Sequence, residues 1–113
     1  MRVELQEGQA WRAWVAVKNG LIVGHVWLQT IKKIPNPVAE SEQHAYLSNL
    51  YVTPEERGGV GTRLVEAAVE WSRLHRIDRI VLWPAPRSVT LYPRFGFTHT
   101  GDVMELRIVK PKE

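Results

Sequence analysis

The first half of the chain carries the apolar pattern of β-strands. The segments 11–18 and 21–31 are rich in tryptophan and branched apolar residues, and the dipeptide Asn19-Gly20 separates them. A type I′ turn needs a positive φ at both of its central residues, which Asn and Gly tolerate. The pattern therefore predicts a β-hairpin, and the aromatic-rich segment 44–52 predicts a further strand.

The pattern becomes helical after this strand. Apolar residues recur at intervals of three and four from residue 60, which predicts a helix with one apolar face that ends near residue 75. Residues 79–83 form a nearly continuous apolar run, as expected for a strand covered on both faces. The remaining pattern predicts a short helix at 88–95, closed by Gly96, and a last strand at 103–109.

This order of elements predicts an α/β fold with a mixed sheet, in one domain that spans residues 1–113. Residues 1–5 alternate enough to add a short strand at the start. The segment 32–43 contains Pro35 and Pro37, which lack backbone donors. We expect it to be a loop or a poorly paired strand extension.

The composition is that of a folded domain. The chain has 113 residues, of which 44% are hydrophobic and 24% charged, enough for a single core. Because Cys is absent, disulfide scaffolds, thiolate zinc sites and a cysteine nucleophile are excluded. No apolar run is long enough to cross a bilayer, and charged residues interrupt the start, where a secretory leader would be apolar. These features predict a cytoplasmic protein without membrane contact.

The charge is distributed unevenly around a formal net charge of +3. From Arg57 to Arg94 there are seven arginines and three acids, whereas residues 40–56 hold four acids and no lysine or arginine. A basic half beside an acidic edge suits a polyanionic ligand next to a cationic one, although solvated helix charges would give the same count. Nucleic-acid binding is not expected, because a recognition helix and an aromatic stacking platform are both missing.

A glycine-rich turn joins the third strand to the helix at residues 52–62 (VTPEERGGVGT). Glycines let a ligand approach the backbone, and the first N–H groups of a helix bind phosphate oxygens. Arg57 adds a bidentate donor and Thr62 a hydroxyl. A P-loop nucleoside triphosphatase is not expected, because the last glycine is followed by Thr62 and Arg63, where that motif has a lysine. The turn is therefore a candidate diphosphate site or, alternatively, only a tight connection.

A second motif lies at residues 91–97 (LYPRFGF). Together with residues 46–54 (YLSNLYVTP) and 57–62 (RGGVGT), it resembles the GNAT (GCN5-related N-acetyltransferase) superfamily, which transfers an acetyl group from acetyl-CoA to an amine. The matching segments resemble its pyrophosphate-binding motif and its LYxxxGF motif. The resemblance covers nearly the whole chain and implies the GNAT fold.

The resemblance implies acetyl-CoA as the acyl donor and a primary amine of a small molecule as the acceptor. No metal is expected, because the histidines are too far apart in the sequence for a metal triad and none has HExxH spacing. A backbone N–H near Leu50, where the strand parts from its neighbour, is expected to stabilise the oxyanion of the transferred acetyl group. The alternative function is an acyl-CoA-binding sensor or subunit without efficient transfer. The residues expected to bind the donor are Leu50, Tyr51, Val52, Arg57, Gly58, Gly59, Val60, Gly61, Thr62 and Ser88.

Two side chains are the candidates for proton transfer. Tyr92 is the candidate general acid, because a phenol is about as basic as the leaving thiolate; the alternative is packing at the end of the short helix. His44 is the candidate base, because histidine is the residue type whose ordinary pKa suits proton transfer near neutrality, but it also fits an edge-strand side chain. Glu40, Glu42 and Tyr46 are alternative bases, and the two glutamates hint at a cationic acceptor.

Three features depart from the family pattern. The glycines arrive one residue early after Arg57, so either Glu56 takes the position of the family's Gln or Arg, or the loop is shorter, which is the interpretation we favour. Ala85 stands where many members have an Asn that holds the pantetheine arm. Few residues precede the hairpin, where members place two helices that wall the acceptor site. We therefore expect a homo-oligomer whose second chain covers apolar side chains of the hairpin, with Trp14, Val26, Trp27 and Leu28 as candidates.

Overall fold

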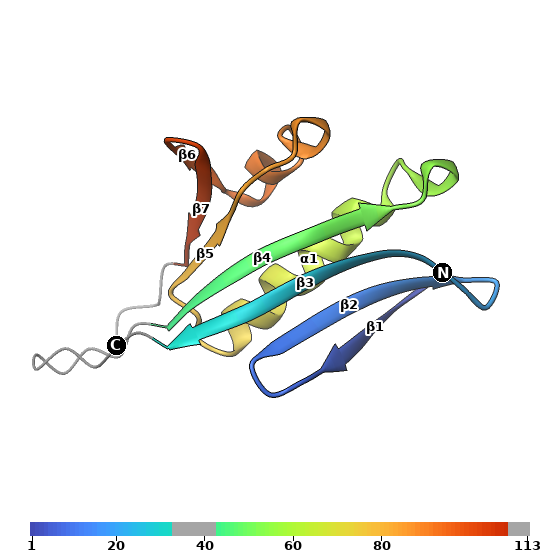
Figure 1. Ribbon diagram of the computed structural model, residues 1–113, viewed down its shortest axis with the longest axis horizontal. Coiled ribbons are helices and arrows are strands. Elements are labelled where there is room, and N and C mark those ends of the chain that lie inside the picture. Colours follow the sequence, from blue (N-terminus) through green and yellow to red (C-terminus); the bar gives the residue numbers. More distant parts are fainter. Residues whose placement is uncertain (33–42, 109–113) are drawn as a thin grey trace, which may run out of the picture.

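The computed structural model of the chain describes residues 1–32 and 43–108, and in these residues seven strands form one mixed sheet in the order β1-β2-β3-β4-β5-β7-β6 (Figure 1). Strands β1 to β4 are antiparallel neighbours, β4 and β5 are parallel, and β5, β7 and β6 are antiparallel. The elements are β1 (Arg2–Glu7), β2 (Trp11–Lys18), β3 (Leu21–Lys32), β4 (Gln43–Val52), α1 (Val60–Leu74), β5 (Arg79–Leu82), β6 (Thr98–Thr100) and β7 (Val103–Arg107).

The predicted α/β class and the predicted hairpin are confirmed. The turn between β2 and β3 has φ angles of 53° at Asn19 and 77° at Gly20, the left-handed conformation that the dipeptide favours. The helix α1 connects the parallel strands β4 and β5, as the strand–helix–strand pattern predicted. Lys32 and Gln43 belong to strands, and the rest of the predicted loop between them lies outside the described residues.

Two predictions in the C-terminal third are wrong in detail. The segment 88–95 is not an α-helix, because it forms two single 3-10 turns, Pro86–Ser88 and Tyr92–Phe95. Pro93 disfavours α geometry in the residue before it, and Gly96 with a φ of 98° ends the second turn. Strand β6 was missed, because three polar residues carry no apolar alternation. The last strand ends at Arg107, and residue 109 lies outside the described residues.

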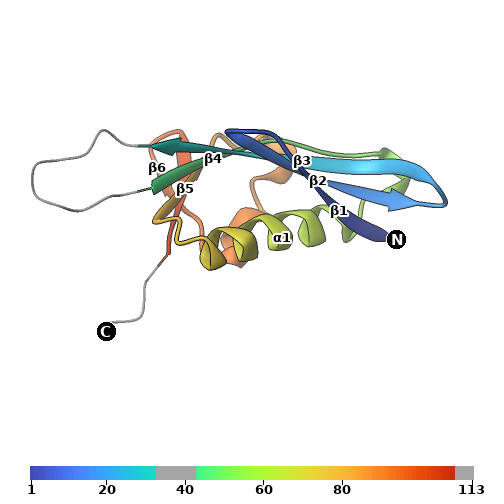
Figure 2. The same ribbon diagram turned by 90° about the horizontal axis from the view of Figure 1, so that it is seen from below.

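The helix α1 covers one face of the sheet, and no helix lies on the opposite face among the residues that the structure describes (Figure 2). Alternate residues of each strand point toward α1. These side chains and the apolar face of α1 make the core. Its largest fully buried members include Val26, Leu28, Leu47, Leu64, Ile80, Leu82 and Met104.

A glycine sets how closely α1 approaches the sheet. A Cβ at Gly24 of β3 would lie 2.9 Å from the backbone oxygen of Tyr51 and 3.2 Å from side-chain atoms of Val60 and Leu64. Only glycine therefore fits here without displacing β4 or the first turns of α1. This contact fixes the start of α1, and with it the glycine turn, against the end of β4.

The prediction that a second chain covers the hairpin is wrong for three of the four named side chains. Trp14, Val26 and Leu28 are 5%, 0% and 0% exposed, because they face α1 within their own chain. Trp27 lies on the opposite face, where its ring centroid is 5.0 Å from that of Trp11. The oligomer itself stays a prediction.

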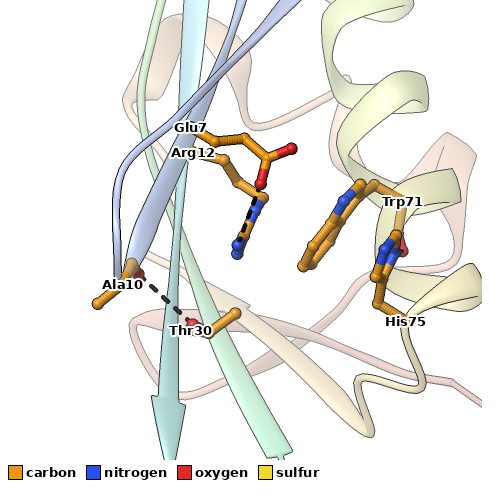
Figure 3. A network of polar contacts seen from close by, with 6 residues as sticks. All are labelled: Glu7, Ala10, Arg12, Thr30, Trp71 and His75. Carbon is orange, nitrogen blue, oxygen red and sulfur yellow. Dashed lines mark hydrogen bonds and ion pairs between the residues drawn. The ribbon is translucent and has the colours of Figure 1, made fainter.

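A buried arginine lies between the sheet and the helix. Arg12 of β2 is 9% exposed, and its guanidinium carbon is 3.9 Å from the ring centroid of Trp71 in α1. The ring of His75 stacks on the other side of Trp71 with centroids 4.0 Å apart (Figure 3). Arg12 Nη2 is 3.8 Å from Glu7 Oε2, whereas Nε and Nη1 are buried and have no hydrogen-bond partner among the described residues. This cation is therefore incompletely paired.

Candidate functional site

Strand β4 separates from β5 halfway along its length. The two strands pair only from residue 44 to residue 46 of β4, with residues 79–81 of β5 as partners, although β4 continues to Val52. Figure 1 shows β4 and β5 diverging beyond this pairing. The predicted parting of the two strands is therefore present, and it exposes one edge of β4 near its carboxyl end.

A bulge interrupts β4 beside this opening. Asn49 has a φ of 53°, and the register between β3 and β4 shifts by one residue between His25 and Trp27. Val26 of β3 therefore lies opposite both Asn49 and Leu50. Neither of these β4 residues has a register partner in β3 or β5. The backbone N–H of Leu50 is thus outside the regular ladder, at the place where the resemblance implied a donor.

A cleft of about 1000 Å³ begins at this opening. It lies between the end of β4, the glycine turn with the first turn of α1, and the segment 85–94. Nine of the ten predicted donor-binding residues line it, and the tenth, Val60, is instead buried in the core. The lining residues are Leu50, Tyr51, Val52, Arg57, Gly58, Gly59, Gly61, Thr62, Ala85, Pro86, Arg87, Ser88, Leu91 and Arg94.

The glycine turn presents open backbone to the cleft. Gly58 and Gly59 have φ angles of 130° and 153°, and a Cβ at either would meet no atom within 4 Å. Gly59 is the N-cap of α1, and no side chain caps the first N–H groups of the helix. These groups and the positive end of the helix dipole therefore face an anion that enters the cleft.

Glu56 and Arg57, the two candidates for the family's Gln or Arg position at the start of this turn, have different roles in the structure. Both carboxylate oxygens of Glu56 accept hydrogen bonds from Lys18 Nζ, at 3.1 and 3.0 Å, and Glu56 does not line the cleft. Arg57 does line it. The pair of Lys18 and Glu56 therefore ties the turn to the end of β2 and leaves Arg57 as the residue that reaches the ligand space.

Two arginines that line the cleft were not predicted from the sequence motifs. Arg87 and Arg94 line the cleft opposite Arg57, one in each of the two 3-10 turns of segment 85–94. The excess of arginine between residues 57 and 94 was the available signal, but it did not show which of the seven would converge. With three guanidinium groups the cleft is strongly cationic and suits a polyanion.

Tyr92 lies just beneath the cleft wall. It is 5% exposed, and its ring packs edge-on against Phe97 with centroids 5.6 Å apart. Burial raises the pKa of Tyr92 above its ordinary value, and a hydrogen bond with the side chain of Ser88 partly offsets this. Ser88 lines the cleft and Tyr92 does not. The phenol is therefore held in its neutral form next to the ligand space, and its role as the acid stays a prediction.

His44 is not brought together with these residues. It lies at the start of β4, where it pairs in register with Ile31 of β3 and Arg79 of β5. Six residues of extended strand separate it from Leu50, a distance of about 20 Å. Its role as the base stays a prediction without support from its position. The alternative bases Glu40 and Glu42 lie outside the described residues.

The described part of the chain holds neither a metal-binding cluster nor a membrane-spanning helix. No three His, Asp or Glu side chains there lie close enough together to hold a metal ion. No helix among the same residues is long and apolar enough to cross a membrane.

Comparison with known proteins decides the family. The model of the acetyltransferase (GNAT) family matches residues 2–97. The chain belongs to the GNAT family. The resemblance stated from the two sequence motifs is therefore confirmed.

Relatives with names and solved structures agree with this assignment. The GNAT chain is 31% identical over 101 residues to a Mus musculus protein described as probable N-acetyltransferase family 8 member 5, covering 86% of this chain and 43% of that protein. An acetyltransferase structure from Clostridium acetobutylicum, solved with acetyl-CoA, matches with a TM-score of 0.71 and 24% identity, covering 80% of this chain and 60% of that one. The structure of Arabidopsis thaliana NAA60 in complex with acetyl-CoA matches with a TM-score of 0.76 and 14% identity, and the match covers 89% of this chain and 78% of that one.

The structural matches show that the mixed sheet with α1 has the GNAT fold. The chain spans less than half of the mouse relative's length.

Proposed function

We propose that this GNAT chain binds acetyl-CoA in the cleft and transfers its acetyl group to a primary amine of a small molecule. The observation that carries the proposal is the convergence of three arginines and an uncapped, glycine-lined helix start on a cleft that opens where β4 parts from β5. Two of the structural neighbours were solved with acetyl-CoA, which supports the same donor here.

The residues present fit the donor. The N–H groups at the start of α1 and the guanidinium of Arg57 would hold the diphosphate, because both are donors to phosphate oxygens. The exposed edge of β4 at Tyr51 and Val52 offers backbone groups to the amides of the pantetheine arm, as an added strand would receive them. A cleft of about 1000 Å³ is large enough for a ligand of this size.

The chain's own groups also suit the transfer. Bound acetyl-CoA supplies the activated acetyl thioester. The N–H of Leu50, outside the strand ladder, would donate to the carbonyl oxygen of that acetyl group. The neutral phenol of Tyr92 would hold the proton needed by the leaving sulfur, with Ser88 between it and the cleft.

Two measurements separate the enzyme from the alternative, a binding module. Calorimetry with acetyl-CoA reports binding, and a thiol-reactive dye reports release of CoA when an amine is added. Binding together with amine-dependent release of CoA supports the transferase. Tight binding without release on a broad amine panel supports the module, and no binding contradicts both.

Replacing Arg57 by alanine is expected to weaken acetyl-CoA binding by about 10- to 100-fold, the range for losing charge-assisted hydrogen bonds to phosphate. The matched control is Arg73→Ala, because Arg73 is an exposed arginine in the last turn of α1 and does not line the cleft. Calorimetry on both variants makes the comparison. Equal affinity in the Arg57 variant and the parent would show that the diphosphate site is assigned wrongly.

We also propose that the chain forms a homo-oligomer through the hairpin face that carries Trp11 and Trp27. Trp11 is 40% exposed, and no described helix covers this face. Light scattering after size exclusion is expected to give at least twice the mass of 13.0 kDa. A mass of one chain at high protein concentration would contradict the proposed oligomer.

The cytoplasmic location of the protein stays a prediction.

A further inference from the structure

An aromatic pair, one ring exposed and the other half-buried, lies where the opening between β4 and β5 begins. The rings of Tyr46 and Trp83 meet edge to face with centroids 5.4 Å apart. Tyr46 points away from α1, because its neighbours Ala45 and Leu47 are buried against the helix side. Trp83 follows β5 directly and is 60% exposed. A large indole is thus left open on the face of the sheet opposite α1.

The pair lies at the start of the opening that leads to the reacting end of the cleft. Residues 44–46 of β4 pair with residues 79–81 of β5, and Trp83 follows two residues beyond this pairing. Its partner ring, Tyr46, is the last paired residue of β4 and precedes Leu50 by four residues along the same strand. The pair is therefore on the side of the opening from which β4 leads to the N–H proposed to contact the acetyl carbonyl.

The charges around the pair oppose an acceptor with a second positive charge. Glu105, which pairs in register with Val81 on this face, is already held by Arg79 Nε at 3.4 Å and Arg107 Nε at 3.5 Å. A polyamine would therefore meet two arginines that share a single carboxylate, while an apolar group would cover the exposed indole and gain from its burial.

We infer that the acceptor is a primary amine that carries a flat apolar group, aromatic in the simplest case, and that this group packs on Trp83 and Tyr46 while the amine faces the acetyl carbonyl. The inference rests on the proposed transferase function and adds the substrate class to it. It makes Trp83 a specificity-determining residue that touches the acceptor and leaves the donor site unchanged.

The test compares three acceptors on the parent and on the Trp83→Ala variant. The acceptors are 2-phenylethylamine, ethanolamine and spermidine. The parent is expected to prefer 2-phenylethylamine over the other two by at least about tenfold in kcat/KM. Trp83→Ala is expected to raise KM for 2-phenylethylamine by about 10- to 100-fold, with kcat and acetyl-CoA affinity little changed. Trp83→Phe should recover most of this loss.

Leu74→Ala is the control, because it removes an exposed apolar side chain at the end of α1, away from the opening and from the hairpin face proposed to form the oligomer. It is expected to leave all three KM values unchanged. A parent that prefers spermidine or ethanolamine, or a Trp83→Ala variant with an unchanged KM for 2-phenylethylamine, overturns the inference while the transferase function stands. If the parent binds acetyl-CoA but acetylates no amine, the proposed function fails and the inference fails with it.

Discussion

Replacing Tyr92 by phenylalanine is expected to lower kcat by about 100-fold or more, the usual contribution of a positioned general acid, and to leave the acetyl-CoA dissociation constant almost unchanged. The change removes one hydroxyl and keeps the ring that packs on Phe97. The fold of segment 91–97 should therefore survive, so that the loss falls on proton transfer alone. Steady-state kinetics and calorimetry on the same preparation measure the two effects separately.

The environment of Tyr92 also fixes the pH dependence. Burial raises the pKa of the phenol above its ordinary value of 10.0, so the proton stays on the oxygen throughout the neutral and mildly alkaline range. The parent's kcat should therefore show no loss from Tyr92 ionisation below pH 10. Because the folded pKa lies above the unfolded one, folding stability from this group is complete below pH 10 and falls as the pH rises through the folded pKa. The phenylalanine variant should lack this alkaline loss.

The control for Tyr92 is a second tyrosine of the same site. Tyr51 lines the cleft and is 43% exposed, so Tyr51→Phe removes a hydroxyl from the ligand space without removing the buried phenol. It is expected to keep kcat within about threefold of the parent, since a group that takes no part in proton transfer contributes little. Equal turnover of Tyr92→Phe and the parent at every pH would remove Tyr92 from the mechanism.

Replacing Arg12 by methionine is expected to raise the free energy of unfolding by about 1–4 kcal/mol, although it removes the charged group that contacts Glu7 and Trp71. Nε and Nη1 of Arg12 are buried without a hydrogen-bond partner among the described residues, and the closest carboxylate oxygen is 3.8 Å from Nη2. A desolvated cation with one distant partner costs more than its contacts return. Methionine keeps an unbranched chain against the Trp71 ring and carries no unsatisfied donor.

Urea unfolding of three proteins tests this prediction. Arg12→Ala is the contrasting variant, because it removes the charge and also the apolar stem that covers Trp71, and it is expected to lower the unfolding free energy. A methionine variant that is less stable than the parent would show that the cation–π contact with Trp71 outweighs the unsatisfied donors. The cleft lies apart from Arg12, so acetyl-CoA affinity should be the same in all three.

Local pattern was enough for most of the sheet and for most of the residues that line the cleft. Asn19-Gly20 determines the turn of the hairpin, because few other residues tolerate positive φ there. The glycines of the turn after β4 likewise marked a place where backbone is open to a ligand. Strand β6 and the two 3-10 turns were not predictable in the same way, because short polar segments carry too few periodic positions to reveal their conformation.

The convergence of side chains was decided by the tertiary structure. The glycine motif marks Arg57, but the other six arginines up to residue 94 are equivalent in the sequence, and only the packing of segment 85–94 brings Arg87 and Arg94 to the same cleft as Arg57.

The sequence by itself determined the order of the elements, the hairpin turn and the glycine-lined start of α1, because each depends on backbone preferences within a few residues. Only the tertiary structure decided which hairpin face is covered, which further arginines line the cleft, and that Arg12 is buried. These features depend on which surfaces meet, and contacts between residues far apart in the chain leave no periodic trace in either segment.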